Sequence, residues 1–266
     1  MRNLLTRSIS GFVYVSLFLF AILYDAKSYI ALTTVFAILC IWEFSKLVKS
    51  KNITPYLFLG GMIYFFIYPI DGYSSITSLV VTLIGSLILI YYLFSSRKIK
   101  SDTILQRLLL QLFYLVLPFY FLISIPFIFE AYQPEILICI LIFIWVNDSF
   151  AYIVGKNFGR TKLFESVSPK KTIEGFFGGL VFSLIAAFFI NQQDNHPSIT
   201  LLDWMIIATI LSIIGTIGDL IESKFKRQAN SKDSGNIMPG HGGMLDRLDS
   251  LFFAAPFVYL YLYFII

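Results

Sequence analysis

The sequence predicts an all-α protein that crosses a membrane about nine times, with residues 1–266 forming a single membrane domain. Hydrophobic residues make up 58% of the chain and charged residues 14%, against roughly a half and a quarter in globular domains. The apolar residues are collected in long runs, and the basic residues lie almost entirely between alternate runs. A soluble fold of this size would need more charged surface than the chain provides.

Nine apolar stretches approach the length of about 20 residues that a helix needs to cross a bilayer. The first follows Arg2 and Arg7 and lacks a small-x-small cleavage site, so we expect a retained span rather than a signal peptide. The fifth contains Pro118, which should kink that helix or mark its weak point. The third and ninth are short. The expected spans are Ser8–Tyr24, Ser28–Val48, Tyr56–Ile70, Tyr73–Phe94, Ile104–Ile125, Ile136–Val154, Ile173–Ile190, Leu201–Ile221 and Leu251–Ile266.

The distribution of Lys and Arg residues supports nine spans and predicts their orientation. With nine spans, 19 of the 20 basic residues fall on one side of the membrane and only Lys27 falls on the other. A missed or extra span would scramble this segregation. The positive-inside rule therefore predicts a cytoplasmic N-terminus and an external C-terminus. The long loops after the sixth and eighth spans lie on the cytoplasmic side, where we expect the functional site.

Carboxylates near the cytoplasmic ends of the spans are candidate functional groups, because charge at membrane depth is costly and usually functional. Asp148 and Glu43 each lie near such an end. Two further sets have i, i+3, i+4 spacing, which places side chains on one helix face: Asp219-Glu222-Ser223 and Asp246-Asp249-Ser250. Two such stripes of oxygen ligands suit a hard cation such as Mg²⁺. The sequence has no His or Cys set of the kind that binds zinc.

Glycines and cations accompany these carboxylates. Between the last two spans the chain carries Lys224-Phe225-Lys226-Arg227, Lys232-Asp233-Ser234-Gly235 and Pro239-Gly240-His241-Gly242-Gly243. Glycines let a backbone approach a ligand closely, and the N-terminus of the helix that follows favours a phosphate. A second basic loop, Ser168–Thr172, contains Lys170 and Lys171 and also opens a helix. These groups predict a site for magnesium and a polyphosphate, which works by positioning and charge neutralisation.

Some of these residues have alternative roles outside a catalytic site. The basic residues at 46–51 and 97–100 are expected to anchor the protein at anionic lipid. Asp246 has the alternative of pairing with Arg247 or capping the last span. Glu43 is either a structural partner or a ligand. His196 lies on the far side of the membrane in the predicted topology, so we expect no role for it at the site.

The segment Ser223–Asp249 spans 27 residues and contains the basic, glycine-rich and carboxylate groups described above, ending in Met244-Leu245-Asp246-Arg247-Leu248-Asp249. It resembles the signature of the phosphatidate cytidylyltransferases, or CDP-diacylglycerol synthases. Three further stretches are similar to the same family: Asn147–Tyr152 with Gly155-Lys156 and Gly159-Arg160, Ser168–Gly175, and Gly218–Ser223. The resemblance covers Asn147 to Asp249. Met238 departs conservatively from the usual Leu, Ile or Phe.

The resemblance implies the transfer of a cytidylyl group from CTP to phosphatidic acid, giving CDP-diacylglycerol and pyrophosphate with Mg²⁺. A second cation such as K⁺ would help to neutralise the two anions. It also implies a bacterial inner membrane protein whose site faces the cytoplasm, a homodimer, and no nucleic-acid partner. Residues 131–266 would form the catalytic part, and residues 1–130 would serve as a scaffold or dimer part.

The roles implied for individual residues fall into three groups. The catalytic group is Asp219, Asp246, Lys226, Arg227 and His241. The substrate-binding group is Lys170, Lys171, Ser223, Lys232, Asp233, Gly242, Gly243 and Arg247. The metal ligands are Asp219 and Asp246, with Asp249 and Asp148 as additional ligands or outer partners. A general base is unnecessary, because the phosphatidate nucleophile is already largely ionised at neutral pH.

Two other classes of protein share parts of this pattern. Transporters also contain intramembrane acids and broken glycine-rich helices, but their sites lie near the midplane, often between inverted repeats. Here the acids gather at one face and the chain shows no repeat. A CTP-dependent polyprenol or phytol kinase would bind the same nucleotide but use an alcohol acceptor. The full signature from Lys232 to Asp249 argues against that reading, and the motif of the CDP-alcohol phosphotransferases is absent from the sequence.

Overall fold

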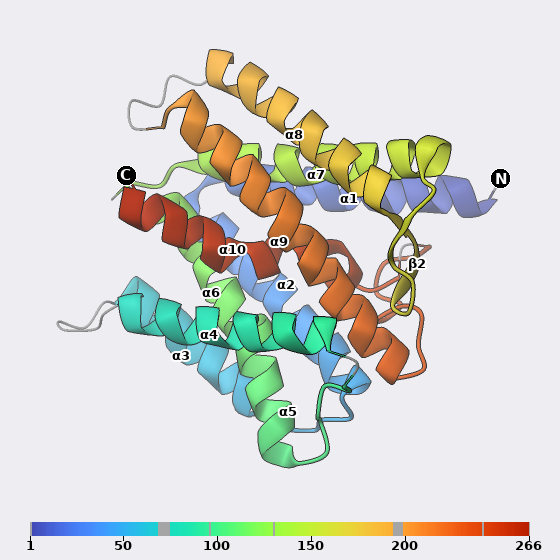
Figure 1. Ribbon diagram of the computed structural model, residues 1–266. Coiled ribbons are helices and arrows are strands. Elements are labelled where there is room, and N and C mark those ends of the chain that lie inside the picture. The colour runs from blue at the N-terminus through green and yellow to red at the C-terminus, as the bar shows by residue number, and fades with distance from the viewer. Residues whose placement is uncertain are drawn as a thin grey trace.

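The computed structural model describes residues 2–68, 75–95, 97–129, 131–193, 199–240 and 242–265 (Figure 1). Long helices make up most of it. In chain order the elements are α1 (Arg2–Tyr24), α2 (Ala26–Leu47), α3 (Thr54–Ile67), α4 (Ser75–Phe94), α5 (Ile104–Gln111), η1 (Leu112–Val116), α6 (Leu117–Ser124), η2 (Ile125–Phe127), α7 (Pro134–Phe158), β1 (Lys162–Phe164), β2 (Ser168–Thr172), α8 (Ile173–Gln193), α9 (Leu201–Gln228) and α10 (Leu245–Ile265).

Six helical segments of the described residues are long and apolar enough to cross a membrane. They are Ala26–Leu47, Ile76–Phe94, Ile104–Phe127, Pro134–Phe158, Ile173–Gln193 and Leu201–Gln228. Two shorter apolar helices, Ser8–Tyr24 and Thr54–Ile67, accompany them. The prediction of a helical membrane protein is therefore confirmed. The count of nine spans and the orientation of the termini stay predictions.

The helix boundaries differ from the predicted ones at the ends that carry charge. Helix α9 continues past Ile221 to Gln228, so Lys224–Arg227 are helical and their predicted place in a loop was wrong. No Gly or Pro interrupts this stretch, and Glu222 and Lys226 form an i, i+4 ion pair at 2.8 Å, which supports the helix. Helix α7 likewise continues past Val154 to Phe158. Hydropathy marks where a span leaves the apolar layer, but the helix itself ends later.

Pro118 lies just after an irregular turn, as predicted. The π-helical segment η1 separates α5 from α6, and the N–H of Leu117 bonds the carbonyl of Leu112, five residues earlier. Proline has no N–H to donate and its ring crowds the preceding turn. The widened turn therefore lies inside one long apolar segment, in which residues 114–116 and 118–124 are buried.

A small hairpin replaces the basic loop that was predicted before α8. Strands β1 and β2 pair antiparallel, with Lys162 opposite Thr172 and Phe164 opposite Ser168. Sequence analysis missed this element because such short strands show no alternating apolar pattern. The hydroxyl of Thr172 accepts the N–H of Gly175 at 3.1 Å and so caps α8. Strand β2 therefore leads straight into the helix and holds Lys170 and Lys171 beside its first turn.

Helices α7 and α8 approach each other closely along a stripe of small residues. The buried positions of α8 are Gly175, Gly179, Ser183 and Ala187, spaced four residues apart. A Cβ atom at Gly179 would lie 2.7 Å from the carbonyl oxygen of Asn147 in α7. Small residues at this spacing let helix backbones pack closely within a membrane. The two helices run antiparallel, with Gly175 near Ala151 and Gly179 near Asn147, the neighbour of Asp148.

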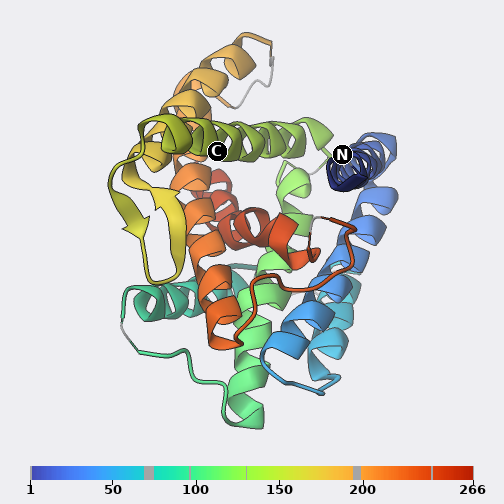
Figure 2. The same cartoon turned by 90° about the vertical axis from the view of Figure 1, so that its right-hand side faces the viewer.

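Helices α9 and α10 lie at the centre and pack against each other (Figures 1 and 2), and between them they contact α2, α4, α6, α7 and α8. An aromatic cluster joins them to α2 and η1. The ring of Phe44 lies 4.8 Å from that of Phe225 and 5.2 Å from that of Tyr114, and Tyr114 lies 5.3 Å from Phe252. Edge-to-face packing at these distances is favourable beyond the burial of area. The cluster joins α2 to α9 and α10, the helices that carry the predicted site residues.

We expect Gly179→Ala to lower the stability of the folded protein by about 1–3 kcal/mol, the usual cost of overpacking, because the new methyl group meets backbone atoms of α7. Thermal unfolding in detergent measures this. Gly60→Ala in α3 is the matched control. A Cβ there meets nothing within 4 Å, so we expect no loss, and Ala favours a helix over Gly by roughly 0.5–1 kcal/mol. Equal unfolding temperatures for the two variants would contradict the close packing of α7 and α8.

Candidate active site

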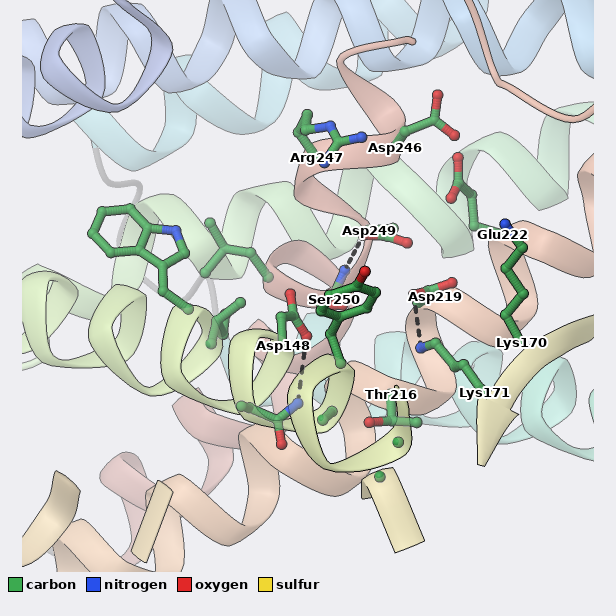
Figure 3. A pocket seen from close by; sticks show the side chains of 18 of the residues that line it. Asp148, Lys170, Lys171, Thr216, Asp219, Glu222, Asp246, Arg247, Asp249 and Ser250 are labelled. Carbon is green, nitrogen blue, oxygen red and sulfur yellow. Dashed lines mark hydrogen bonds and ion pairs between the residues drawn. The ribbon is translucent and has the colours of Figure 1, made fainter. Parts of the chain in front are cut away.

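A cavity of about 910 Å³ lies where α1, α7, α8, α9, α10 and β2 meet. Figure 3 shows Asp148, Asp219 and Lys171 among the charged side chains at this cavity. The charged residues that line it are Asp148, Lys156, Lys162, Lys170, Lys171, Asp219, Glu222, Lys226, Asp233, Asp246, Arg247 and Asp249. Other parts of its wall are apolar and include Tyr14, Leu141, Trp145 and Leu251. The cavity therefore joins a cluster of ionisable groups to a hydrophobic surface formed by α1, α7 and α10.

Three carboxylates from two helices meet in this cavity. Oxygen atoms of Asp219, Glu222 and Asp249 lie within 4.8 Å of one another. Glu222 is 1% exposed, and its Oε1 atom has no hydrogen-bond partner among the described residues. Carboxylates so close together repel one another unless a cation lies between them or one of them holds a proton, and hard oxygen ligands suit Mg²⁺. The donor set therefore fits a divalent cation.

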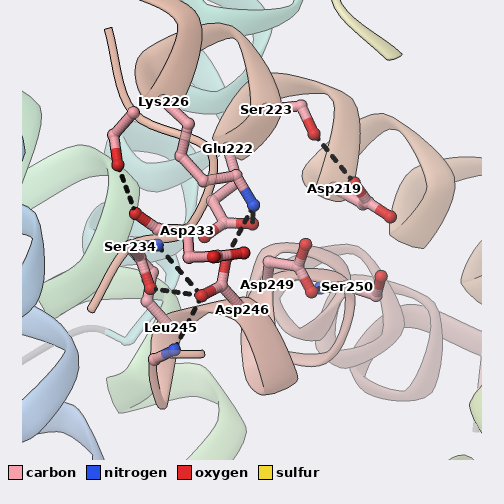
Figure 4. A network of polar contacts seen from close by, with 12 residues as sticks. Asp219, Glu222, Ser223, Lys226, Asp233, Ser234, Leu245, Asp246, Asp249 and Ser250 are labelled. Carbon is pink, nitrogen blue, oxygen red and sulfur yellow. Dashed lines mark hydrogen bonds and ion pairs between the residues drawn. The ribbon is translucent and has the colours of Figure 1, made fainter. Parts of the chain in front are cut away.

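Asp246 lies outside this set of three carboxylates and shares the ammonium group of Lys226 with Glu222 (Figure 4). Its Oδ1 atom accepts from the ammonium group of Lys226 at 2.6 Å, and Lys226 also pairs with Glu222 at 2.8 Å. Its Oδ2 atom accepts the N–H and hydroxyl of Ser234 at 3.0 and 2.8 Å and the N–H of Gly243 at 2.8 Å. Both oxygens of Asp246 thus bind groups of the chain. Its predicted role as a metal ligand stays a prediction.

Lys171 approaches the cluster from the hairpin. Its ammonium group lies 2.7 Å from Oδ2 of Asp219. Desolvation of the ammonium favours the neutral form, but the Asp219 carboxylate outweighs this and raises the pKa of Lys171 above its usual value. Lys171 is therefore charged and partly exposed to the cavity. The hydroxyl of Ser223 donates to the other oxygen of Asp219 at 3.2 Å, so that predicted substrate-binding residue lies beside the carboxylates.

Asp148 faces the cavity from α7, on the side opposite the hairpin cations (Figure 3). Its Oδ1 atom accepts from the amide of Asn147 at 3.4 Å. It lies outside the set of three carboxylates whose oxygens converge among the described residues, so its part in metal binding stays a prediction. Glu222, which the sequence placed on the same face as Asp219 but which was not among the metal ligands implied by the resemblance, belongs to the converging set. Its i, i+3 spacing from Asp219 was the signal that could have identified it.

The glycine-rich loop turns back on itself before α10. Gly242 has φ +90°, a conformation that favours glycine, and its carbonyl accepts the N–H of Met238 at 3.0 Å. The N–H of Gly243, which we expected to face a phosphate, donates to Asp246 instead. In the structure the hydrogen bond from the Gly243 N–H to Asp246 stabilises the turn of the loop. The substrate-binding roles of Gly242 and Gly243 stay predictions, and His241 lies outside the described residues.

The remaining predicted residues divide between the cavity and its supports. Asp233 and Arg247 line the cavity. Arg227 donates to the carbonyls of Val167 at 3.3 Å and Ser231 at 3.1 Å, so it joins the hairpin to the loop after α9. Lys232 is exposed in that loop. The structure therefore brings Arg227 and Lys232 near the site without placing either on the cavity wall described above.

Helix α1 completes the site, which the sequence did not predict, whereas Glu43 of α2 was already a candidate. Gly11, Tyr14 and Val15 of α1 line the cavity, and the hydroxyl of Ser10 donates to the carbonyl of Pro239 at 3.0 Å. Figure 2 shows the loop after α9 running across to α1 and α2 before α10 enters the centre. No local pattern in a hydrophobic helix reveals such a contact, since it depends on how distant helices pack.

Comparison with known proteins gives a consistent family. The model of the cytidylyltransferase family matches residues 5–265. The phosphatidate cytidylyltransferase of Bacillus subtilis is 33% identical over 270 residues, which cover 98% of each chain. That of Haemophilus influenzae is 33% identical over 288 residues, covering 96% of this chain and 94% of its own. That of Aquifex aeolicus is 40% identical over 147 residues, about half of each chain.

We expect Lys226→Met to destabilise the protein by about 3–5 kcal/mol, because it leaves Glu222 and Asp246 buried without their cation. Thermal unfolding in detergent measures the loss. Lys98→Met, in an exposed loop, is the control and should unfold like the wild type. A Lys226→Met variant as stable as the control would show that the pairing of these groups does not support the fold.

Proposed function

Because the chain belongs to the cytidylyltransferase family, we propose that it transfers a cytidylyl group from CTP to phosphatidate with Mg²⁺ at the cytoplasmic face of the inner membrane. The products are CDP-diacylglycerol and pyrophosphate. The near full-length similarity to two phosphatidate cytidylyltransferases supports the reaction. The single structural observation that carries it is the convergence of Asp219, Glu222 and Asp249 beside Lys171, in a cavity with an apolar wall.

Asp219, Glu222 and Asp249 would hold Mg²⁺, since their oxygens converge and one oxygen of Glu222 is otherwise unpaired among the described residues. When bound, the ion would neutralise charge on the phosphates of the nucleotide and of the lipid. Asp148 and Asp246 are proposed as further ligands or as outer partners. A second cation such as K⁺ belongs to the same proposal, because two polyanions meet at one site.

The reaction is a displacement at phosphorus. A phosphatidate oxygen attacks the α-phosphorus of CTP in line, an O–P bond forms, and the bond to the leaving pyrophosphate breaks. The nucleophile is already ionised, so no proton has to move first. Lys170, Lys171 and Arg247 line the cavity and would bind the phosphates, orienting attacking and leaving groups. Catalysis would therefore come from position and electrostatics, as in other phosphoryl transfers.

The lipid would reach the site along the apolar part of the wall. Tyr14 and Val15 from α1, Leu141 and Trp145 from α7, and Leu251 from α10 line it. A hydrophobic surface continuous with charged groups suits a substrate whose phosphate must reach the carboxylates while its acyl chains stay in the bilayer. The homodimer implied by the family resemblance is also part of the proposal, and the mass of the purified protein in detergent tests it.

The reaction itself predicts lipid-bound label. Purified protein given α-labelled CTP, phosphatidate and Mg²⁺ should form labelled CDP-diacylglycerol and release pyrophosphate. Omitting phosphatidate or chelating the metal with EDTA should stop the reaction, and added Mg²⁺ should restore it. Transfer of label from γ-labelled CTP to an alcohol lipid, with none to phosphatidate, would overturn the proposal in favour of a lipid kinase.

Asp219→Asn and Asp249→Asn keep the shape of the side chains but remove their charge. We expect each to lower turnover by about 10²- to 10³-fold, the range for losing one group that stabilises a transition state. Asp102→Asn, in an exposed loop, is the matched control and should retain full turnover. Isothermal titration with Mg²⁺ should show weaker binding in the two site variants. Unchanged turnover and Mg²⁺ affinity would contradict the metal assignment.

The proposed orientation is tested with single cysteines in a chain whose Cys40 and Cys139 are replaced by Ala. Asn236→Cys lies in the exposed loop after α9, and Gln193→Cys lies at the exposed end of α8. In intact spheroplasts, an impermeant maleimide should label the cysteine at position 193 and reach position 236 only after permeabilisation. The reverse pattern would place the site outside the cytoplasm.

A further inference from the structure

Glu43 is a buried carboxylate that the proposed reaction does not use. It lies in α2, far in sequence from the carboxylates of the cavity, and is 0% exposed. A buried charge is costly unless it is paired or hydrogen-bonded. Among the described residues no cation lies within ion-pair distance of it, since Lys171 pairs with Asp219 and Lys226 pairs with Glu222 and Asp246. Its retention therefore needs a specific partner.

The partners of Glu43 belong to the loop before α10 and to the start of α10. Its Oε2 atom accepts the backbone N–H of Leu245, the first residue of α10, at 2.8 Å. The same atom accepts from the hydroxyl of Ser234 at 3.3 Å. The first N–H groups of a helix have no partner within the helix, and the positive end of the helix dipole favours a carboxylate. Glu43 thus caps α10 from another part of the chain.

The loop fits around this carboxylate closely. A Cβ atom at Gly235 or at Gly243 would collide with the Glu43 side chain. These two glycines of the motif are therefore explained by the approach of Glu43, whereas the sequence alone suggested that they make room for a ligand. The Ser234 Oγ atom also lies 2.8 Å from Oδ2 of Asp246, so Glu43 and Asp246 share the one hydroxyl hydrogen of this residue, and the Ser234 N–H donates to Asp246 as well.

We propose that Glu43 is a positioning residue that fixes the glycine-rich loop and the first turn of α10, and thereby places Asp246 and Asp249 in the cavity. The proposal rests on the proposed catalytic role of that turn. Asp246 binds Lys226, and Asp249 meets Asp219 and Glu222, so a shift of the turn moves both contacts together. Glu43 touches neither the cavity wall described above nor the converging carboxylates, so its effect is transmitted through the loop backbone.

The test compares Glu43→Ala with Glu43→Gln and with Thr33→Ala. Thr33 is a buried polar residue of the same helix, so its variant controls for the loss of buried polar packing in α2. Each folded variant is assayed for kcat and KM with CTP. A second readout is tryptic cleavage after Lys232, which is exposed in the loop, measured below the unfolding temperature. This readout does not depend on any activity.

Glu43→Ala should lower kcat on the order of 10- to 100-fold, as loss of an orienting partner does at other sites, with a smaller change in KM, and should speed cleavage after Lys232. Glu43→Gln keeps an oxygen for the Leu245 N–H and should recover most of kcat. A folded Glu43→Ala variant with the kcat and cleavage rate of Thr33→Ala would overturn the proposal.

If Glu43→Ala does not fold, Ser234→Ala tests the same link with a smaller change. It should lower kcat several-fold and speed cleavage, whereas wild-type values for both would overturn the proposal. The wild-type assay separates the proposed reaction from the proposed role of Glu43. A wild type that forms no CDP-diacylglycerol contradicts the proposed function, while the cleavage comparison still decides whether Glu43 holds the loop.

Discussion

The burial of one ammonium group between two carboxylates is the interaction on which the rest of the site depends. Lys226 lies 2.8 Å from Glu222 on its own helix and 2.6 Å from Asp246 on the next. Without Lys226, Glu222 and Asp246 would each carry a buried, unpaired charge. The pair of contacts fixes α9 against the start of α10, and that contact brings Asp249 to Asp219. The ammonium group of Lys226 thus sets the distance between the carboxylates of α9 and those of α10.

The outer wall of the site depends on close packing rather than on charge. The small residues of α8 let it approach α7 closely, and the hairpin before α8 is held at its end by Thr172. Because the hairpin enters the helix directly, Lys171 arrives 2.7 Å from Asp219. A larger residue at Gly179 would therefore affect more than stability, since it would move the strand that carries the hairpin cations relative to α9.

The N-terminal helices, which were expected to form a scaffold or dimer part, also take part in the site. Helix α1 lines the cavity, and α2 binds the loop through Glu43. The aromatic cluster around Tyr114 joins α2 to α9 and α10. In a bilayer, where the hydrophobic effect does not distinguish a helix neighbour from lipid, such packing and polar contacts are what set helix positions.

The sequence by itself determined that this is a helical membrane protein, because its apolar runs have the length that a helix needs to cross a bilayer. It determined the family through the motif that ends at Asp249. It also placed Asp219 and Glu222 on one face, because the helical period fixes neighbours within a helix. Only the tertiary structure decided which carboxylates meet: Asp249 joins that pair, while Asp246 turns to Lys226 and Glu43 caps α10. Contacts between helices depend on crossing angles and on side-chain packing across the interface, which no local spacing records.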